Sequence, residues 1–361
     1  MKTTDVRVRR AVTAIAAGQA VVVTDGADGD GFLVFAADAA TAGLLHFTIR
    51  HTSGFLRVAL PGNECARLQL PPMCHGDSPD CVSVDVSGTG TGISASDRAK
   101  TIAALGSAAT VAADLHRPGH VIPVQVRPDG VLGQRGAAEA AADLARLAGR
   151  GQAAGFCEIV SRRNPVLVAR GGELIEFAVE HGLAVVSIPE LVAYRRRTEP
   201  QVIRLTEAVI PTWAGSARVI GFRNTHGDGE HLAVIVGIAG AGVPVPLHIH
   251  VECLTGDVFG SCACRCGSEL RDALSRMAAQ GGGMVLYLRP SGAPRACGLF
   301  DGRSAREEFT SETVTWMLRD LGVYAIRLSD DVPGFGLVLF GAIRQSGIES
   351  PLPDATWAAA G

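Results

Sequence analysis

Four cysteines lie within a short stretch of the chain, at positions 253, 262, 264 and 266. Thiolates are soft ligands that suit zinc. One residue separates Cys264 from Cys266, and Cys253 can reach them across a loop, so three thiolates can converge on one tetrahedral ion. Three protein ligands would leave a fourth position for water, which is the arrangement of a catalytic zinc that lowers the pKa of its water to about 7.

Two other interpretations of the cluster stay open. Cys262 could be a fourth ligand that closes the site into a structural zinc, or the cysteines could simply be reduced. A tight cluster in an intracellular chain favours a metal over a disulfide framework. The other five cysteines are scattered and are expected to be ordinary reduced thiols: Cys65, Cys74, Cys81, Cys157 and Cys297.

Two histidines precede the cluster on an expected strand. His248 and His250 alternate, so they lie on the same face of that strand. Either could contact a substrate phosphate, although a strand histidine is more often a structural residue with its own hydrogen-bond partner.

The composition indicates a globular chain of two domains. Of 361 residues, 47% are hydrophobic and 19% are charged, and the formal net charge is -3. This charge gives no case for binding nucleic acid or an acidic membrane surface. The N-terminus is expected to form an amphipathic helix rather than a signal peptide, and no apolar run is long enough to span a membrane, so we expect a cytoplasmic protein.

Alternating helix and strand patterns predict an α+β (mixed α/β) fold, with a mixed sheet and covering helices in each domain. The charged run at 195–200, RRRTEP, is the best boundary and is expected to be a solvated linker. The predicted domains are residues 1–197 and 201–345, followed by a tail, 346–361, without periodicity. Ser94 is expected to cap a helix that begins near Asp97.

Residues 252–261, ECLTGDVFGS, followed by Cys264 and Cys266, resemble the zinc motif of GTP cyclohydrolase II. The resemblance implies that Cys253, Cys264 and Cys266 bind zinc. It also implies opening of the guanine ring of GTP, with loss of formate and pyrophosphate and with magnesium assisting at the phosphates. The neighbours that it places at the nucleotide are His248, His250, Glu252, Glu269 and Gly292, with Tyr287 and Arg289 as weaker candidates near the reacting atoms.

The segment after Arg289 departs from this family's pattern. The family continues with QEGRGIGL, whereas this chain has PSGAPRACGL at 290–299, without the glutamate. The stretch that carries the family's general base and catalytic arginine is missing between Leu299 and the helix expected at 307–321. The sequence therefore does not identify the catalytic residue. Two aspartates, at 330 and 331, stand near the position where the family has a lysine in its phosphate-contacting turn, and they would repel a triphosphate.

The N-terminal half resembles 3,4-dihydroxy-2-butanone 4-phosphate synthase over most of residues 7–197. The motifs that match include TGISASDR at 91–98, RPGHVIP at 117–123 and Cys157-Glu-Ile159. This family makes dihydroxybutanone phosphate and formate from ribulose 5-phosphate, and holds magnesium through an acidic loop and the histidine of a GHTEA motif. The site residues that remain here are Ser94, His120, Glu139 and Glu158.

The metal pair of the synthase family is absent. The acidic loop is DGADGDGF at 25–32, and GHTEA is GAAEA at 136–140, which places Ala137 where the metal histidine belongs. Because alanine cannot bind a metal, we expect the synthase activity to be absent or severely reduced. Aspartates 25, 28 and 30 could bind magnesium in a new register, but Asp/Gly runs are usually plain loops.

These patterns together predict a member of the bifunctional riboflavin-biosynthesis family that joins the two enzymes. The expected function is zinc-dependent opening of GTP, with an inactive synthase half. The alternatives are a degenerate paralogue that binds zinc and a nucleotide or partner subunit, and a relative that acts on a different nucleotide. Both families form homodimers, so the resemblance implies a homodimer.

Overall fold

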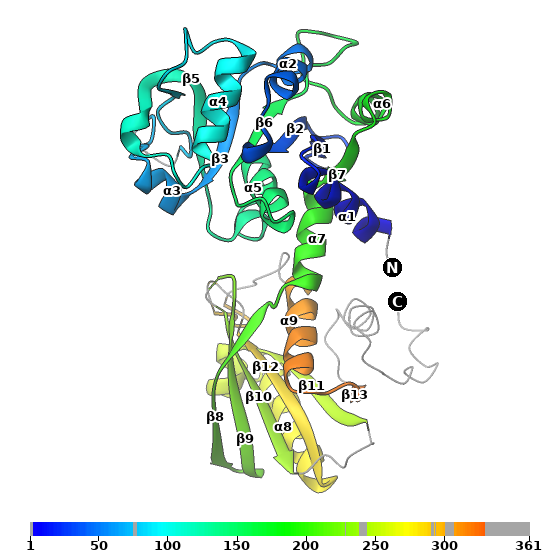
Figure 1. Cartoon of the computed structure of the whole chain (residues 1–361). Coiled ribbons are helices and arrows are strands. Elements are labelled where there is room, and N and C mark those ends of the chain that lie inside the picture. Colours follow the sequence, from blue (N-terminus) through cyan, green and yellow to red (C-terminus); the bar gives the residue numbers. More distant parts are fainter. Residues whose placement is uncertain are drawn as a thin grey trace. The chain divides into compact units, whose positions relative to one another are not determined.

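The computed structural model describes residues 3–74, 78–227, 229–237, 244–289, 292, 294–299 and 307–328. The chain forms two compact units, Met1–Thr198 and Glu199–Gly361 (Figure 1). The aspartates at 330 and 331 and the tail expected from 346 lie outside the described residues.

A seven-stranded mixed sheet forms the centre of the N-terminal unit, in the order β4-β5-β3-β6-β2-β1-β7. The pairs β1–β7 and β3–β5 are parallel, and the other pairs are antiparallel. The strands are β1 Val21–Thr24, β2 Gly31–Ala36, β3 Arg57–Pro61, β4 Val84–Val86, β5 Leu115–Val126, β6 Ala154–Glu158 and β7 Ala184–Ser187.

Helices cover both faces of this sheet because its strands are apolar on both sides. Val22 packs in a core with α2, α4 and α6, whereas its neighbours Val21 and Val23 pack in a second core with α1, α5 and α7. The helices are α1 Thr3–Ala16, α2 Ala42–His51, α3 Gly62–Arg67, α4 Ala95–Leu105, α5 Ala137–Leu147, α6 Gly172–His181 and α7 Ile188–Thr198. Ser94 caps α4 by accepting a hydrogen bond from the Asp97 N–H, as predicted.

The expectation of a solvated linker at 195–200 was wrong for its first residues. Residues 195–198 are the last turn of α7, and Arg195 and Arg196 are each only 4% exposed. The Arg195 guanidinium lies 2.7 Å from an Asp143 carboxylate oxygen and donates a hydrogen bond to the Asp129 carbonyl. Arg195 can therefore be buried because Asp143, which is distant in sequence, neutralises its charge.

The C-terminal unit has a six-stranded mixed sheet, in the order β13-β11-β12-β10-β9-β8. Strand β11 is parallel to β12 and β13, and the other pairs are antiparallel. The strands are β8 Val202–Thr212, β9 Gly215–Asn224, β10 Glu230–Gly237, β11 Val245–Val251, β12 Gly282–Arg289 and β13 Ile326–Leu328.

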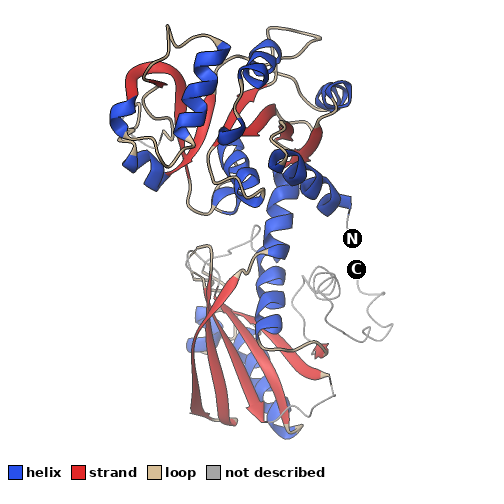
Figure 2. Ribbon diagram, viewed as in Figure 1, coloured by secondary structure: helices blue, strands red, loops and turns tan. Residues whose placement is uncertain are grey.

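The two faces of this sheet carry different helices (Figure 2). Helix α9, Glu307–Asp320, packs Val314 and Met317 against a core that includes Leu286 of β12. Helix α8, Cys266–Ala279, contacts the same strand through Met277, which leaves no room for a side chain at Gly283. The side chain of Tyr287 alternates with Leu286 and so lies on the α8 side. The predicted α+β class, with two domains that each have a mixed sheet and covering helices, is confirmed.

A buried histidine gives the C-terminal unit a predicted pH response. Burial and the nearby Arg289 lower the pKa of His231 to about 4, and its Nδ1 accepts a hydrogen bond from the Arg289 N–H while Nε2 lies 2.9 Å from Asn224 Oδ1. Its ordinary pKa is 6.5. Between about pH 6.5 and pH 4, His231 is protonated in the unfolded chain but not in the folded chain. The free energy of unfolding therefore decreases as the pH falls through this range, by on the order of 3 kcal/mol.

The comparison is urea unfolding of the wild type and His231→Gln between pH 7.5 and 4. Glutamine offers a donor and an acceptor but does not titrate, so the variant should lose less stability over this range. The wild type and the variant have the same cysteines and other titratable groups. The difference between them in how the free energy of unfolding changes with pH therefore reports His231 alone. Equal slopes would contradict the assignment.

Candidate metal centre

The cysteine cluster lies where the parallel strands β11 and β12 end on one side of the sheet. Strand β11 ends at Val251 and leads directly to Cys253, and a single π-helical turn, Leu254–Val258, follows. Helix α8 begins at Cys266. Because the carboxyl ends of parallel strands meet at one edge, residues that follow β12 return to the same place as those that follow β11.

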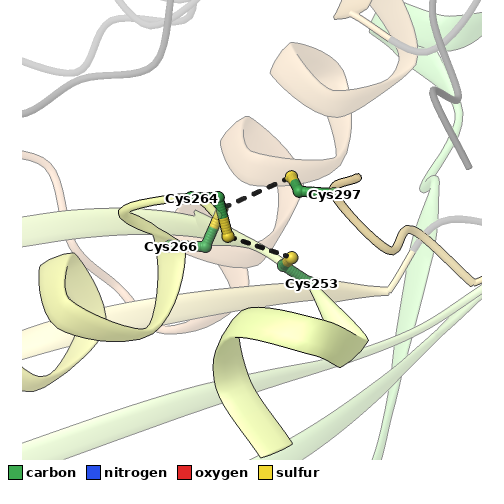
Figure 3. Close-up of side chains that lie close together, drawn as sticks. All are labelled: Cys253, Cys264, Cys266 and Cys297. Carbon is green, nitrogen blue, oxygen red and sulfur yellow. Dashed lines mark hydrogen bonds between the residues drawn. The ribbon is translucent and has the colours of Figure 1, made fainter. Parts of the chain in front are cut away.

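The sulfur atoms of Cys253, Cys264, Cys266 and Cys297 all lie within 4.8 Å of one another (Figure 3). The sulfurs of Cys253 and Cys264 are 3.8 Å apart, and those of Cys266 and Cys297 are 3.9 Å apart. A disulfide bond would require about 2.05 Å. The three cysteines predicted as zinc ligands are therefore brought together, and a fourth cysteine joins them.

The fourth member of the cluster is Cys297, so two expectations require correction. Cys262 was the candidate for a fourth ligand, but it is exposed and is not in the cluster. Cys297 was expected to be an ordinary scattered thiol, yet it lies beside Cys266. The short spacing of Cys262 from Cys264 made it the candidate, whereas Cys297 approaches from a different loop, 31 residues after Cys266.

The donor set fits zinc. Four thiolates at the usual zinc–sulfur distance of about 2.3 Å from a tetrahedral ion would be separated by about 3.8 Å. The two close sulfur pairs, at 3.8 and 3.9 Å, match that edge and share no cysteine. Soft, closely grouped sulfurs favour zinc over magnesium or calcium, which prefer oxygen.

The thiols of the cluster differ in acidity. Burial alone would raise the pKa of Cys253, but interactions with the Thr255 side chain and with the backbone at Cys297 and Gly256 outweigh it and lower the pKa to about 6. Burial raises the pKa of Cys266 and of Cys297. Of these three thiols, Cys253 is therefore the most acidic.

Two glycines let the turn after Cys253 pack against the start of α8. A Cβ atom at Gly267 would lie 2.1 Å from the Gly256 carbonyl oxygen, and one at Gly256 would lie 3.1 Å from the Cys264 sulfur. Only backbone atoms fit at this contact, so the two glycines set the distance between the segments that carry Cys253 and Cys266.

Asp257 is a residue of the site to which the sequence analysis gave no role. Its buried carboxylate accepts hydrogen bonds from the Tyr287 hydroxyl at 2.8 Å, from the Cys253 N–H at 2.8 Å and from His250 Nε2 at 3.0 Å. Burial alone would raise the pKa of Asp257, but these hydrogen bonds outweigh it and lower the pKa. Asp257 thereby connects β11 and β12 to a cysteine of the cluster. Its place within the ECLTGDVFGS motif was the only signal in the sequence.

Of the residues expected at the nucleotide, His250 and Tyr287 belong to this network, and the others have different neighbours. His250 stacks on Tyr287, with ring centroids 5.3 Å apart, and His248 is buried beside His250. Glu252 pairs with Arg289 at 3.0 Å. Glu269 lies in the first turn of α8, 3.5 Å from Arg265, and Gly292 lies in a bend with φ of +97°.

The residues retained in the synthase half have partners within the protein. His120 Nδ1 lies 2.7 Å from an Asp85 carboxylate oxygen, and Ser94 is the cap of α4. Glu139 is buried on α5, where burial raises its pKa, and accepts a hydrogen bond from the Arg127 N–H. Ala137, in place of the expected metal histidine, begins the same helix.

Glu158 and one aspartate of the acidic loop, Asp30, form ion pairs with arginines. Glu158 forms an ion pair with Arg57, whose guanidinium lies 4.6 Å from the centre of the Phe156 ring. Asp30 of the acidic loop lies 2.6 Å from Arg170. Both carboxylates therefore have a positively charged partner within the protein.

Two family models match the chain: 3,4-dihydroxy-2-butanone 4-phosphate synthase over residues 9–194, and GTP cyclohydrolase II over residues 203–331. Riboflavin biosynthesis protein RibBA of Nocardia farcinica is 48% identical over 291 residues, which are 78% of this chain and 70% of that protein. The chain belongs to the RibBA family. The RibBA of Mycobacterium tuberculosis strain H37Ra is also 48% identical, over 295 residues that are 78% of this chain and 69% of that protein.

A solved structure also resembles this RibBA-family chain. RibBX of A. baumannii, described as a two domain 3,4-dihydroxy-2-butanone 4-phosphate synthase, matches with a TM-score of 0.69 and 28% identity, covering 92% of this chain and 96% of that one. The predicted family is thus confirmed, and the chain is a riboflavin-biosynthesis protein with synthase and cyclohydrolase II domains. Among the described helices, none is long and apolar enough to cross a membrane.

Proposed function

We propose that the C-terminal half, residues 201–345, is a zinc-dependent hydrolase that opens the guanine ring of GTP and releases formate and pyrophosphate. The observation that carries this proposal is the convergence of Cys253, Cys264 and Cys266 at the end of β11, beside the Asp257 network. Zinc bound there would supply an activated water by lowering its pKa to about 7.

The protein's own groups have positioning roles in this proposal. Asp257 holds the Cys253 backbone, His250 and Tyr287 in fixed orientations through its three hydrogen bonds. Glu252 and Glu269 carry the acceptors that would recognise the base, as carboxylates pair well with the N–H groups of guanine. His248, Arg289 and Gly292 complete the proposed nucleotide contacts, and magnesium would act at the phosphates.

We propose further that the N-terminal half, residues 1–197, has lost most or all synthase activity. Ala137 cannot bind a metal, and Glu158 is already paired with Arg57. An ion pair in place of a metal leaves the remaining carboxylates without the divalent charge that enolisation of a sugar phosphate requires. The full chain would act in the cytoplasm as a homodimer, without nucleic acid or membrane partners.

In the test, the full chain is incubated with zinc, magnesium and either GTP or ribulose 5-phosphate, and the formate that is released is measured. Formate is expected from GTP and not from ribulose 5-phosphate. An intact RibBA relative serves as the positive control for both substrates. Formate from ribulose 5-phosphate at the relative's rate would overturn the proposed loss of the synthase.

A second function, a zinc-binding paralogue without turnover, is favoured by one observation. A fourth thiol beside the three expected ligands can fill the position that water needs. Stoichiometric zinc without formate from GTP or from a panel of other purine and pyrimidine nucleotides would support this second function. Formate from another nucleotide alone would indicate a changed substrate.

A further inference from the structure

We propose that Cys297 is the fourth ligand of the zinc, so that the resting site is closed by four thiolates and opens only when Cys297 leaves. This inference rests on the zinc site of the proposed function but not on GTP turnover. In this proposal Cys297, in the segment after β12, occupies the coordination position that would otherwise be open.

The sulfur positions support a single four-thiolate site. The close pairs, Cys253 with Cys264 and Cys266 with Cys297, are two opposite edges of one tetrahedron because they share no corner. All four sulfurs also lie within 4.8 Å of one another. A bystander thiol would lie beside one ligand only, whereas Cys297 is within reach of all three (Figure 3).

Backbone contacts hold Cys297 in this position. The Leu254 N–H donates a hydrogen bond of 2.8 Å to the Arg295 carbonyl, and the Thr255 hydroxyl donates one of 3.1 Å to the Cys297 carbonyl. Between them, Ala296 is buried. The turn that follows Cys253 therefore also fixes the segment that carries Cys297, and the two ligands are positioned together.

The closed site has a consequence for activity. Three thiolates leave a position for water, whereas four thiolates fill the tetrahedral shell of zinc. Turnover would then scale with the fraction of molecules in which a water has replaced the Cys297 thiolate at the metal. Removing this thiolate should open the site permanently.

The direct readout is X-ray absorption at the zinc edge of the full-length, zinc-loaded protein. Wild type should show four sulfur neighbours at about 2.3 Å. Cys297→Ala should show three sulfurs and one lighter neighbour. Cys262→Ala is the matched control, because Cys262 is exposed and outside the cluster, and it should keep four sulfurs.

Three sulfurs in the wild type, or loss of a sulfur in Cys262→Ala, would overturn the proposal. Cys297→Ser is the second variant if the alanine variant does not fold. The wild-type spectrum alone decides between three and four sulfur ligands. Formate release from GTP is measured in parallel and should rise about tenfold or more in Cys297→Ala if fewer than about a tenth of wild-type sites are open. Four sulfurs without formate from any variant would refute GTP turnover and leave the four-thiolate site standing.

Discussion

Replacing Cys264 with serine is expected to weaken zinc binding by the full-length protein about a hundredfold. Structural zinc sites bind with about 10–16 kcal/mol, so each of four thiolates contributes on the order of 3 kcal/mol, which is about two factors of ten in affinity. The Cys264 sulfur lies 3.8 Å from that of Cys253 and within reach of the other two. Its loss therefore removes a corner of the site rather than a peripheral contact.

The measurement is competition for zinc between the protein and a chelator of known affinity. Cys262→Ser is the matched control, because this cysteine is two residues away but exposed and outside the cluster. Its zinc affinity should equal that of the wild type. Equal weakening in the two variants would mean that the cluster does not bind the metal as described.

Replacing Asp257 with alanine is expected to destabilise the C-terminal unit by about 3–5 kcal/mol. The buried carboxylate accepts hydrogen bonds from Tyr287, His250 and the Cys253 N–H, and all three donors would lose their partner. Because the Cys253 N–H is one of these donors, zinc affinity should also fall.

Tryptophan fluorescence during urea unfolding measures this effect in the full chain. All three tryptophans, at 213, 316 and 357, lie in the C-terminal unit, so the signal does not report the N-terminal unit. Asp272→Ala, an exposed aspartate on α8, is the control and should change stability by less than about 0.5 kcal/mol. A similarly small change in Asp257→Ala would show that the network does not stabilise the unit.

Local patterns in the sequence predicted most of the elements and three of the four clustered thiols. Ser94 was expected to cap a helix that begins near Asp97, and it caps α4, because a serine three residues before an acidic residue is a local capping signal. Cys253, Cys264 and Cys266 could be predicted together because they lie within one short segment. Such features are determined by neighbours in the chain.

Features that depend on contacts distant in sequence could not be predicted in this way. Cys297 reaches the cluster only because β12 is parallel to β11 and ends beside it. Arg195 is buried because Asp143, 52 residues earlier, offers a carboxylate. Strand β8 gave no strand signal of its own because nearly all of its residues are exposed, so its sequence lacks the alternation of a half-buried strand.

The most direct test of ring opening by this site measures formate and pyrophosphate together from GTP, using zinc-loaded wild type and Cys297→Ala with magnesium, and zinc-free wild type as the control. We expect equal amounts of the two products, faster release from Cys297→Ala than from the zinc-loaded wild type, and none from the zinc-free protein. One zinc per chain in wild type and Cys297→Ala, with neither product from either, would contradict the claim that this site opens the guanine ring.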